Sequence, residues 1–328
     1  MGRVSTEAIP EAGSPHEGTK AVVAAMAANI GIALMKLLTW LLTGAASLLA
    51  EAIHSMADSF NQILLLIGTK ASKRKPTPLH PFGFGHERFL SAFLVAIILF
   101  TMGGLFAIYE AFNKYQEVRA GHPDGLVESR WWWVAIAVIL GAMVAESLSL
   151  RTGVHEANQV RRPGQSWARF VRETRSPELP VILLEDTAAL AGLMFALIGV
   201  GLTKLTGNAM WDVAGSAAIG LLLVAVAIIL AIKIQGLLVG ASAAPEEVER
   251  IQATIEATPG VERVIHLRTL HLGPEDVMVA AKIAVPEARS AHDVAHIIDD
   301  AEAQVRATSP MVGLIYLEPD IDRRETSG

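Results

Sequence analysis

The chain has 328 residues, of which 52% are hydrophobic and 18% are charged, and its formal net charge is −6. This balance is typical of a membrane protein in contact with a lipid bilayer and excludes an ordinary soluble domain. Because there is no cysteine, disulfides and thiolate metal sites are excluded, and any metal needs His, Asp, Glu or backbone oxygen ligands. No block of Lys and Arg suggests a nucleic-acid partner.

Six apolar stretches follow a polar N-terminal segment. Residues 1–18 contain Pro, Gly and Ser without an apolar core, so we expect a disordered cytoplasmic tail and not a signal peptide. Residues 19–240 then predict a polytopic α-helical bundle with six transmembrane helices, each long enough to cross a bilayer. The predicted spans are residues 21–42, 47–68, 88–112, 131–150, 179–202 and 211–234, with a tight turn at residues 43–46.

Basic residues collect in two of the predicted loops. The loop between spans two and three and the loop between spans four and five are both rich in Lys and Arg, whereas the first and fifth turns are short and nearly uncharged. By the positive-inside rule, both termini are expected to be cytoplasmic. The basic residues are Lys70, Lys73, Arg74, Lys75 and Arg88 in one loop, and Arg151, Arg161, Arg162, Arg169, Arg172 and Arg175 in the other.

The pattern changes at residue 244. Pro245 and two acidic residues begin a helix, two alternating segments follow on either side of Gly273 and Pro274, and an amphipathic helix and a short strand complete the region. The order helix, strand, strand, helix, strand predicts a small cytoplasmic α+β domain over residues 244–320. A domain of this size buries little by itself, so dimerisation is expected. Residues 321–328 are expected to be a disordered tail.

The second span carries charge in its interior. His54 and Asp58 are four residues apart, so they lie on one helix face and can both reach one divalent cation. A structural alternative is an Asp that is capped by a neighbouring helix and a His that is hydrogen-bonded to a carbonyl group. Ionisable residues inside a membrane span are costly and usually functional, which favours the metal site.

Three further charged residues, Lys36, Glu51 and Asp212, lie in the predicted spans. Lys36 and Glu51 flank the turn at Gly44 at matched depth, so they predict a buried ion pair, with Glu146 as an alternative partner for Lys36. Asp212 follows Trp211 at the start of span six and is interpreted as a helix-start acid favoured by the helix dipole.

Four motifs give the chain a family resemblance. They are SLLAEAIHSMADSFNQ, HPFGFGHERF, LLEDTAALAG and TGNAMWDVAGSAAIG. Together they resemble the cation diffusion facilitator family. The resemblance implies a six-span bundle, a ferredoxin-like or metallochaperone-like cytoplasmic domain, a homodimer, and no enzyme activity. It also implies efflux of a divalent metal, usually Zn²⁺, from the cytoplasm in exchange for protons, with no permanently bound cofactor.

The resemblance also assigns metal ligands on spans two and five. His54 and Asp58 match the family's pair on span two, and Asp186 matches its second ligand on span five. Ile182 stands at the remaining ligand position and cannot coordinate a metal, so Glu185 or water is left to complete the site. One nitrogen and several oxygens suit Zn²⁺, and Mn²⁺, Fe²⁺ or Co²⁺ are the alternatives.

The family's soluble domains bind additional metal, which makes several other residues candidates for peripheral sites. In the soluble domain, an equally weighted alternative is that these histidines lie on the surface and bind no metal, because Tyr316 stands where the family often has a His. In the loop between spans two and three, a structural role is favoured over metal binding. The candidates are His80 and His86 in that loop and His266, His271, His292, His296 and Glu318 in the soluble domain.

The resemblance and the residues together predict a secondary antiporter that works by alternating access. Metal requires deprotonated ligands, so protons arriving from the opposite side would displace it. A passive channel, a membrane metalloenzyme and a membrane metal sensor are the rival functions. The expected location is a bacterial plasma membrane.

Overall fold

The computed structural model describes residues 15–122, 124–287 and 289–321. Most of the two predicted tails, residues 1–14 and 322–328, lies outside the described residues. Helix α1 begins at Pro15, so residues 15–18 of the predicted tail are helical.

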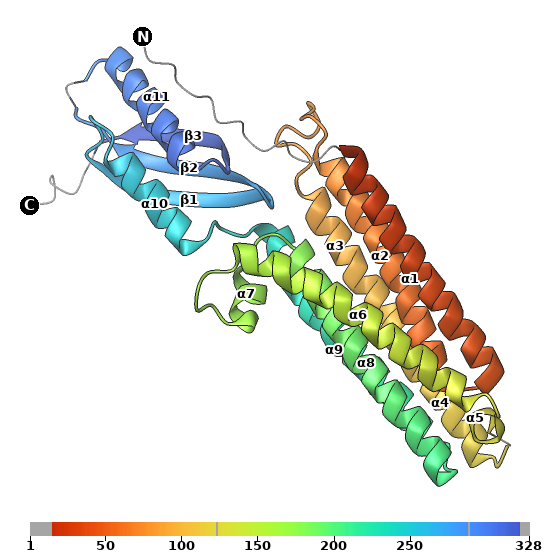
Figure 1. The fold of residues 1–328 in the computed structure, drawn as a ribbon. Helices are drawn as coiled ribbons and strands as arrows, with labels where there is room; N and C mark the ends of the chain where they lie inside the picture. The colour runs from red at the N-terminus through yellow and green to blue at the C-terminus, as the bar shows by residue number, and fades with distance from the viewer. Residues whose placement is uncertain (1–14, 123, 288, 322–328) are drawn as a thin grey trace, which may run out of the picture.

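Long, roughly parallel helices form one elongated bundle, and the soluble domain lies at one end of it (Figure 1). The helix α3, the π-helix η1 and α4 run on as one continuous rod, so they correspond to a single predicted span. Short helices α5 and α7 lie in the connections on either side of α6. The bounds are α1 Pro15–Thr43, α2 Ala46–Ser72, α3 Glu87–Ile98, η1 Leu99–Leu105, α4 Phe106–Arg119, α5 Gly125–Glu128, α6 Trp132–Val160, α7 Trp167–Glu173, α8 Glu178–Thr206 and α9 Met210–Gly240.

Four segments of the described chain are long and apolar enough to cross a membrane, and six were predicted. They are the rod from α3 to α4, α6, α8 and the segment that begins with α9. The described apolar part of α1, Asn29–Thr43, is shorter, and α2 is long but carries Glu51, His54 and Asp58 on its buried side. Polar residues needed inside a bundle lower the mean hydropathy of a helix, which explains why length and apolarity do not select α2.

The rod contains a π-helix that the sequence analysis did not predict. Gly103 and Gly104 lie in η1, where a Cβ at Gly104 would come within 2.6 Å of Val224 Cγ2 on α9. The missing side chain therefore lets η1 and α9 pack closely. Wider π-helical turns occur frequently at functional sites, and a Cβ at Gly103 would lie 3.9 Å from His54 Nδ1.

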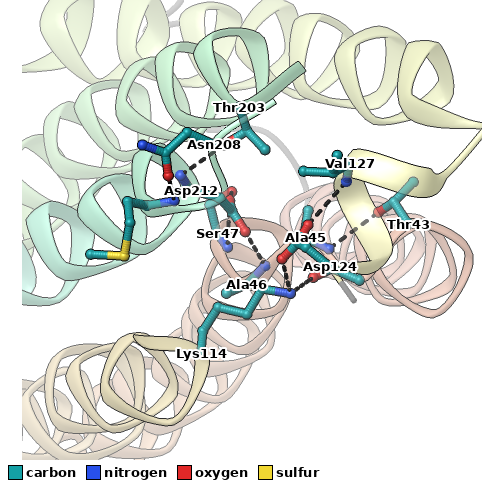
Figure 2. Close-up of polar contacts among 12 residues, drawn as sticks. Thr43, Ala45, Ala46, Ser47, Lys114, Asp124, Val127, Thr203, Asn208 and Asp212 are labelled. Carbon is teal, nitrogen blue, oxygen red and sulfur yellow. Dashed lines mark hydrogen bonds and ion pairs between the residues drawn. The ribbon is translucent and has the colours of Figure 1, made fainter. Parts of the chain in front are cut away.

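A polar network joins the helices at the end of the bundle away from the soluble domain (Figure 2). Asp212 is fully buried and accepts hydrogen bonds from Ala46 N at 2.6 Å and Ser47 Oγ at 2.5 Å. Its carboxylate thus caps the N-terminus of α2, whereas the sequence analysis interpreted it as an acid that serves its own helix. Beside it, Lys114 Nζ lies 2.8 Å from Asp124 Oδ2 and donates to the Gly44 carbonyl at 3.1 Å.

The soluble domain has two layers, a three-stranded sheet and two helices. Its elements follow the predicted order and are α10 Pro245–Glu256, β1 Arg263–Gly273, β2 Asp276–Ala284, α11 Ala291–Thr308 and β3 Val312–Asp320. The strands lie in the order β1-β2-β3, with β1 antiparallel and β3 parallel to β2. Alternate residues of β2 such as Val279 and Ile283 are fully buried with Ile251, Ile255 and Val305 of the helices, as a half-buried strand requires.

Candidate metal centre

One face of α2 is buried and polar. Ser47, Glu51, Ser55, Asp58 and Asn61 recur every three or four residues along the helix and so share this face with His54. The polar face looks into the bundle and not toward lipid, because its members are buried or nearly so. A membrane helix with this pattern carries a functional or pairing face along its whole length.

His54 and Asp58 lie close together on this face. His54 Nε2 is 3.6 Å from Asp58 Oδ2, the imidazole is 1% exposed, and the Asp58 side chain is 16% exposed. Both ring nitrogens of His54 and the Oδ1 atom of Asp58 are buried without a hydrogen-bond partner among the described residues. Buried polar atoms normally find partners, so one ring nitrogen of His54 together with Asp58 Oδ1 suits a cation.

The two acidic residues of α8 point to different neighbours. Glu185 Oε1 accepts a hydrogen bond from Asn61 Nδ2 on α2 at 2.6 Å, whereas Asp186 Oδ2 accepts one from Ser149 Oγ on α6 at 2.8 Å. Successive helical residues are about 100° apart, and the two carboxylates diverge accordingly. Glu185 is buried and Asp186 is half-buried, so the more accessible of the two faces α6.

Ile182 fills space against α6. A Cβ added at Gly153 would lie 3.5 Å from Ile182 Cγ2, so this side chain packs at the Gly153 position. Ile182 and Asp186 are four residues apart and share this α6 side of α8. The position where the family resemblance places a ligand therefore makes an aliphatic contact.

The four predicted ligands gather in one region without forming a closed coordination shell. Among the described residues, no group of three His, Asp or Glu side chains is arranged to hold a metal ion. His54, Asp58, Glu185 and Asp186 nevertheless lie near enough to interact electrostatically. The arrangement consists of two pairs of side chains, from α2 and α8, that must approach each other to share one cation.

Lys36 places a positively charged side chain next to this region. Its Nζ lies 3.0 Å from Glu51 Oε2 and donates to Ser55 Oγ at 2.8 Å, and both ionic side chains are fully buried. Lys36 therefore pairs with Glu51 and not with Glu146, its other candidate partner. Glu51 also lies against α8, since a Cβ at Gly192 would overlap Glu51 Oε1.

The candidate peripheral residues occupy separate places. The rings of His80 and His86 make edge-on contacts with Phe84 and Phe89, respectively, so each packs in its own turn. Structural roles therefore account for both rings, and metal binding by His80 and His86 stays a prediction.

The candidates of the soluble domain fall into three groups. His271 is buried and its Nδ1 lies 3.0 Å from the Gly273 carbonyl oxygen, while burial lowers the pKa of its ring. His292 Nε2 and His296 Nε2 lie 3.2 Å apart on the surface of α11. His266 and Glu318 line a shallow cavity with Tyr316, and Glu318 pairs with Lys282 at 3.0 Å.

Three residues of the centre escaped the sequence analysis. Asn61 and Ser149 hold the two carboxylates of α8, and Gly103 lies against the His54 ring. The spacing of Asn61, three residues after Asp58, could have placed it on the same face. Nothing in the local sequence of α6 marks Ser149, whose role depends on the packing of α6 against α8.

Known proteins match almost the whole chain. The profile of the cation efflux transmembrane domain matches residues 22–238, and that of the cation efflux protein cytoplasmic domain matches residues 243–320. The human protein "Proton-coupled zinc antiporter SLC30A9, mitochondrial" is 35% identical over 265 residues, which cover 80% of this chain and 45% of that protein. "Metal tolerance protein C4" of Arabidopsis thaliana is 27% identical over 80% of this chain and 56% of its own length. The chain thus spans about half the length of these relatives.

Bacterial relatives match over a larger share of their own length. "Magnetosome protein MamM" of Paramagnetospirillum magneticum is 26% identical over 84% of this chain and 80% of that protein. A solved MamM-CTD structure covers 23% of this chain and 90% of its own, with 26% identity and a TM-score of 0.23. The two profiles together cover both the helical bundle and the soluble domain. This chain belongs to the cation diffusion facilitator family of cation efflux proteins.

Proposed function

We propose that this chain is a secondary active transporter that moves a divalent transition-metal cation, Zn²⁺ first among them, out of the cytoplasm in exchange for protons. The observation that carries the proposal is the pair His54 and Asp58, which lie together in the bundle, where both ring nitrogens of His54 and Oδ1 of Asp58 have no hydrogen-bond partner among the described residues. A neutral imidazole and a carboxylate are ligands that zinc accepts.

Asp186 and Glu185 are the proposed partners from α8. Asp186 is the stronger candidate, because Ser149 is its only hydrogen-bond partner among the described residues and its side chain is half-buried. Glu185 supplies the remaining oxygen, once its bond to Asn61 is exchanged for the metal. A small approach of α8 to α2 would bring these oxygens to His54 and Asp58, and an equilibrium between such arrangements is what alternating access requires.

The donor set bears on the choice of metal. Ile182 supplies no ligand at the remaining position on span five, so the site offers one imidazole and otherwise oxygen. Oxygen-rich sites favour harder ions, and an Mn²⁺, Fe²⁺ or Co²⁺ antiporter with the same mechanism is the alternative. The name of the human relative, a zinc antiporter, supports Zn²⁺ as the first ion to test.

Coupling to protons follows from the ligands themselves. The metal binds deprotonated side chains, so each arrival of metal releases protons and each arrival of protons competes with metal. Lys36 is paired with Glu51, so that carboxylate is already engaged and is not proposed as a metal ligand. Only the ligands then exchange protons for metal.

The assembly is part of the proposal. A homodimer with six spans per subunit and both termini in the cytoplasm agrees with the cytoplasmic-domain profile and with the basic loops. The bacterial plasma membrane expected from the sequence has no support from the zinc antiporters among the relatives, whose names place them in mitochondria.

Flux measurements in proteoliposomes test the function. Wild-type chain should move Zn²⁺ only when a proton gradient is applied, and Asp58→Ala should stop this movement. Glu110→Gln is a matched control, because Glu110 is a half-buried carboxylate on α4 that lies apart from the centre. Flux without any dependence on the proton gradient would indicate a channel, and binding without flux would indicate a sensor.

A further inference from the structure

A cavity lies between the helical bundle and the soluble domain, on the side of the bundle where that domain sits. Its volume is ≈ 610 Å³, and it is bounded by α7 and its flanking loops on one side and by the start of α10 and the end of β1 on the other. Figure 1 shows α7 beside the inner end of α6 and facing α10. Pockets of this size hold small organic ligands.

Four arginines line the cavity, and acidic neighbours neutralise two of them. Arg162 forms a bidentate ion pair with Glu246, and Arg169 Nε donates to Glu173 Oε1 at 2.8 Å. A third acidic residue of the lining, Glu247, is engaged by Arg250 at 3.0 Å. The acidic residues of the lining are therefore already paired.

Arg172 and Arg175 are the other two arginines of the lining. The Nε atom of Arg175 is buried and has no hydrogen-bond partner among the described residues, and Arg172 is exposed at the cavity wall without a carboxylate partner there. Burial lowers the pKa of Arg175, because the charged guanidinium loses water and the carboxylate of Glu173 offsets this loss only in part. A buried cationic donor without a partner is costly, so this group is suited to an anion.

The side chain of Lys233 fastens the backbone segment that carries these two arginines. Lys233 Nζ, near the inner end of α9, donates to the carbonyl oxygens of Arg172 at 2.5 Å and Thr174 at 2.6 Å.

The N-terminus of α10 enters the same cavity at Pro245, and the positive end of a helix dipole adds attraction for anions. His271 lines the opposite wall, and its lowered pKa keeps it neutral near pH 7.

We propose that this cavity binds a phosphate group through Arg172 and Arg175. Guanidinium groups match phosphate oxygens in a bidentate geometry, and the cavity lies at the membrane end of the soluble domain, where lipid headgroups gather. The phosphate can belong to an anionic lipid headgroup or to a free phosphate compound. Bound there, the ligand would join the bundle to the soluble domain, since both contribute to the lining.

Binding to the purified full-length chain in detergent tests this site. The probes are dioctanoyl phosphatidylglycerol, dioctanoyl phosphatidylcholine as the zwitterionic control, and inorganic phosphate as a competitor, each titrated by calorimetry. Wild type should bind phosphatidylglycerol saturably, and Arg172→Gln with Arg175→Gln should weaken this by about tenfold or more, the value of one charge-assisted hydrogen bond. Arg268→Gln, at an exposed arginine of β1 outside the cavity, should bind as the wild type does.

The competitor separates the two sources of phosphate. Displacement of the lipid by inorganic phosphate would assign the site to free phosphate compounds, and failure to displace it would assign the site to a lipid headgroup. Should the double variant be poorly folded, Arg172→Gln alone decides, because its side chain is exposed. Binding of phosphatidylglycerol that neither variant weakens, or no binding by the wild type, would overturn the proposal.

Discussion

Lys36 Nζ lies 3.0 Å from Glu51 Oε2, and both side chains are 0% exposed inside the helical bundle. Removing one partner leaves the other as an uncompensated buried charge. Lys36→Met should therefore destabilise the chain by about 3–5 kcal/mol. Denaturant unfolding in detergent measures this.

The double change provides the control for this ion pair. Lys36→Met with Glu51→Gln removes both charges and should recover much of the lost stability. If the double variant is as unstable as the sum of the two single variants, the two residues do not act as a pair.

The cap of α2 by Asp212 gives a second stability prediction. Asp212→Ala leaves Ala46 N and Ser47 Oγ without their acceptor in a buried position, at a cost of about 1–3 kcal/mol. Asp212→Asn keeps an acceptor oxygen and should lose less. Thermal unfolding of both variants checks this order, and equal losses would show that the charge and not the acceptor is what matters.

The π-helix predicts a difference between two glycines. Gly104→Ala places a methyl group against Val224 of α9 and should destabilise the bundle by about 1–3 kcal/mol, the range for overpacking. Gly141→Ala on α6 is the matched control, because a Cβ there meets nothing within 4 Å. It should be neutral or slightly stabilising, since Ala favours helix more than Gly. Similar unfolding midpoints for the two variants would mean that η1 and α9 do not pack as described.

A pH prediction concerns His271 in the soluble domain. Burial lowers the pKa of His271 in the folded chain, so the unfolded chain binds the proton more readily. Its contribution to stability is then fully present above its reference pKa of about 6.5 and is lost as the pH falls below that value. Hydrogen exchange of β1, corrected for intrinsic rates, should show protection falling between pH 7.5 and 5.5. His271→Gln should flatten this dependence, and an unchanged slope would exclude His271 as its source.

Patterns that lie within one segment were readable from the sequence. Alternation and turn residues predicted the order of elements in the soluble domain, and matched depth across the turn at Gly44 predicted the pairing of Lys36 with Glu51. Contacts between segments that are distant in the chain could not be predicted from the sequence. Asp212 caps a helix 166 positions away from it in the chain, and Ser149 reaches Asp186 only because α6 packs on α8.

The arrangement of the candidate ligands could be predicted only in part, for the same reason. The spacing of His54 and Asp58 fixes them on one face of α2, and the structure places them together. The directions of Glu185 and Asp186 depend on which helices pack on each side of α8. The structure turns Glu185 toward Asn61 and Asp186 toward Ser149, a division that adjacent positions in the sequence do not reveal.

The ligand assignment on α8 makes its own prediction. If Asp186 binds the metal, Asp186→Ala should abolish flux, while Glu185→Ala weakens it, because Glu185 is already bonded to Asn61. Wild-type flux in Asp186→Ala together with lost flux in Glu185→Ala would show that the metal ligand is Glu185 and not Asp186.

Two exchanges of donor type test the choice of metal. His54→Asp should shift preference from Zn²⁺ toward Mn²⁺, because an oxygen replaces the borderline nitrogen. Ile182→His should tighten Zn²⁺ binding by adding a nitrogen on the side of α8 that Asp186 shares. Competition binding on purified protein measures both, and an unchanged order of metals in both variants would contradict this donor set.

The most direct test of the account is proton-driven Zn²⁺ flux in proteoliposomes for Asp58→Ala and Asp186→Ala, with folding checked by the unfolding midpoint. The account predicts that both variants remain folded, bind Zn²⁺ more weakly and carry no flux, because each removes a charged ligand from one shared site between α2 and α8. Flux at the wild-type rate in both variants would contradict it and would place the transport site elsewhere in the chain.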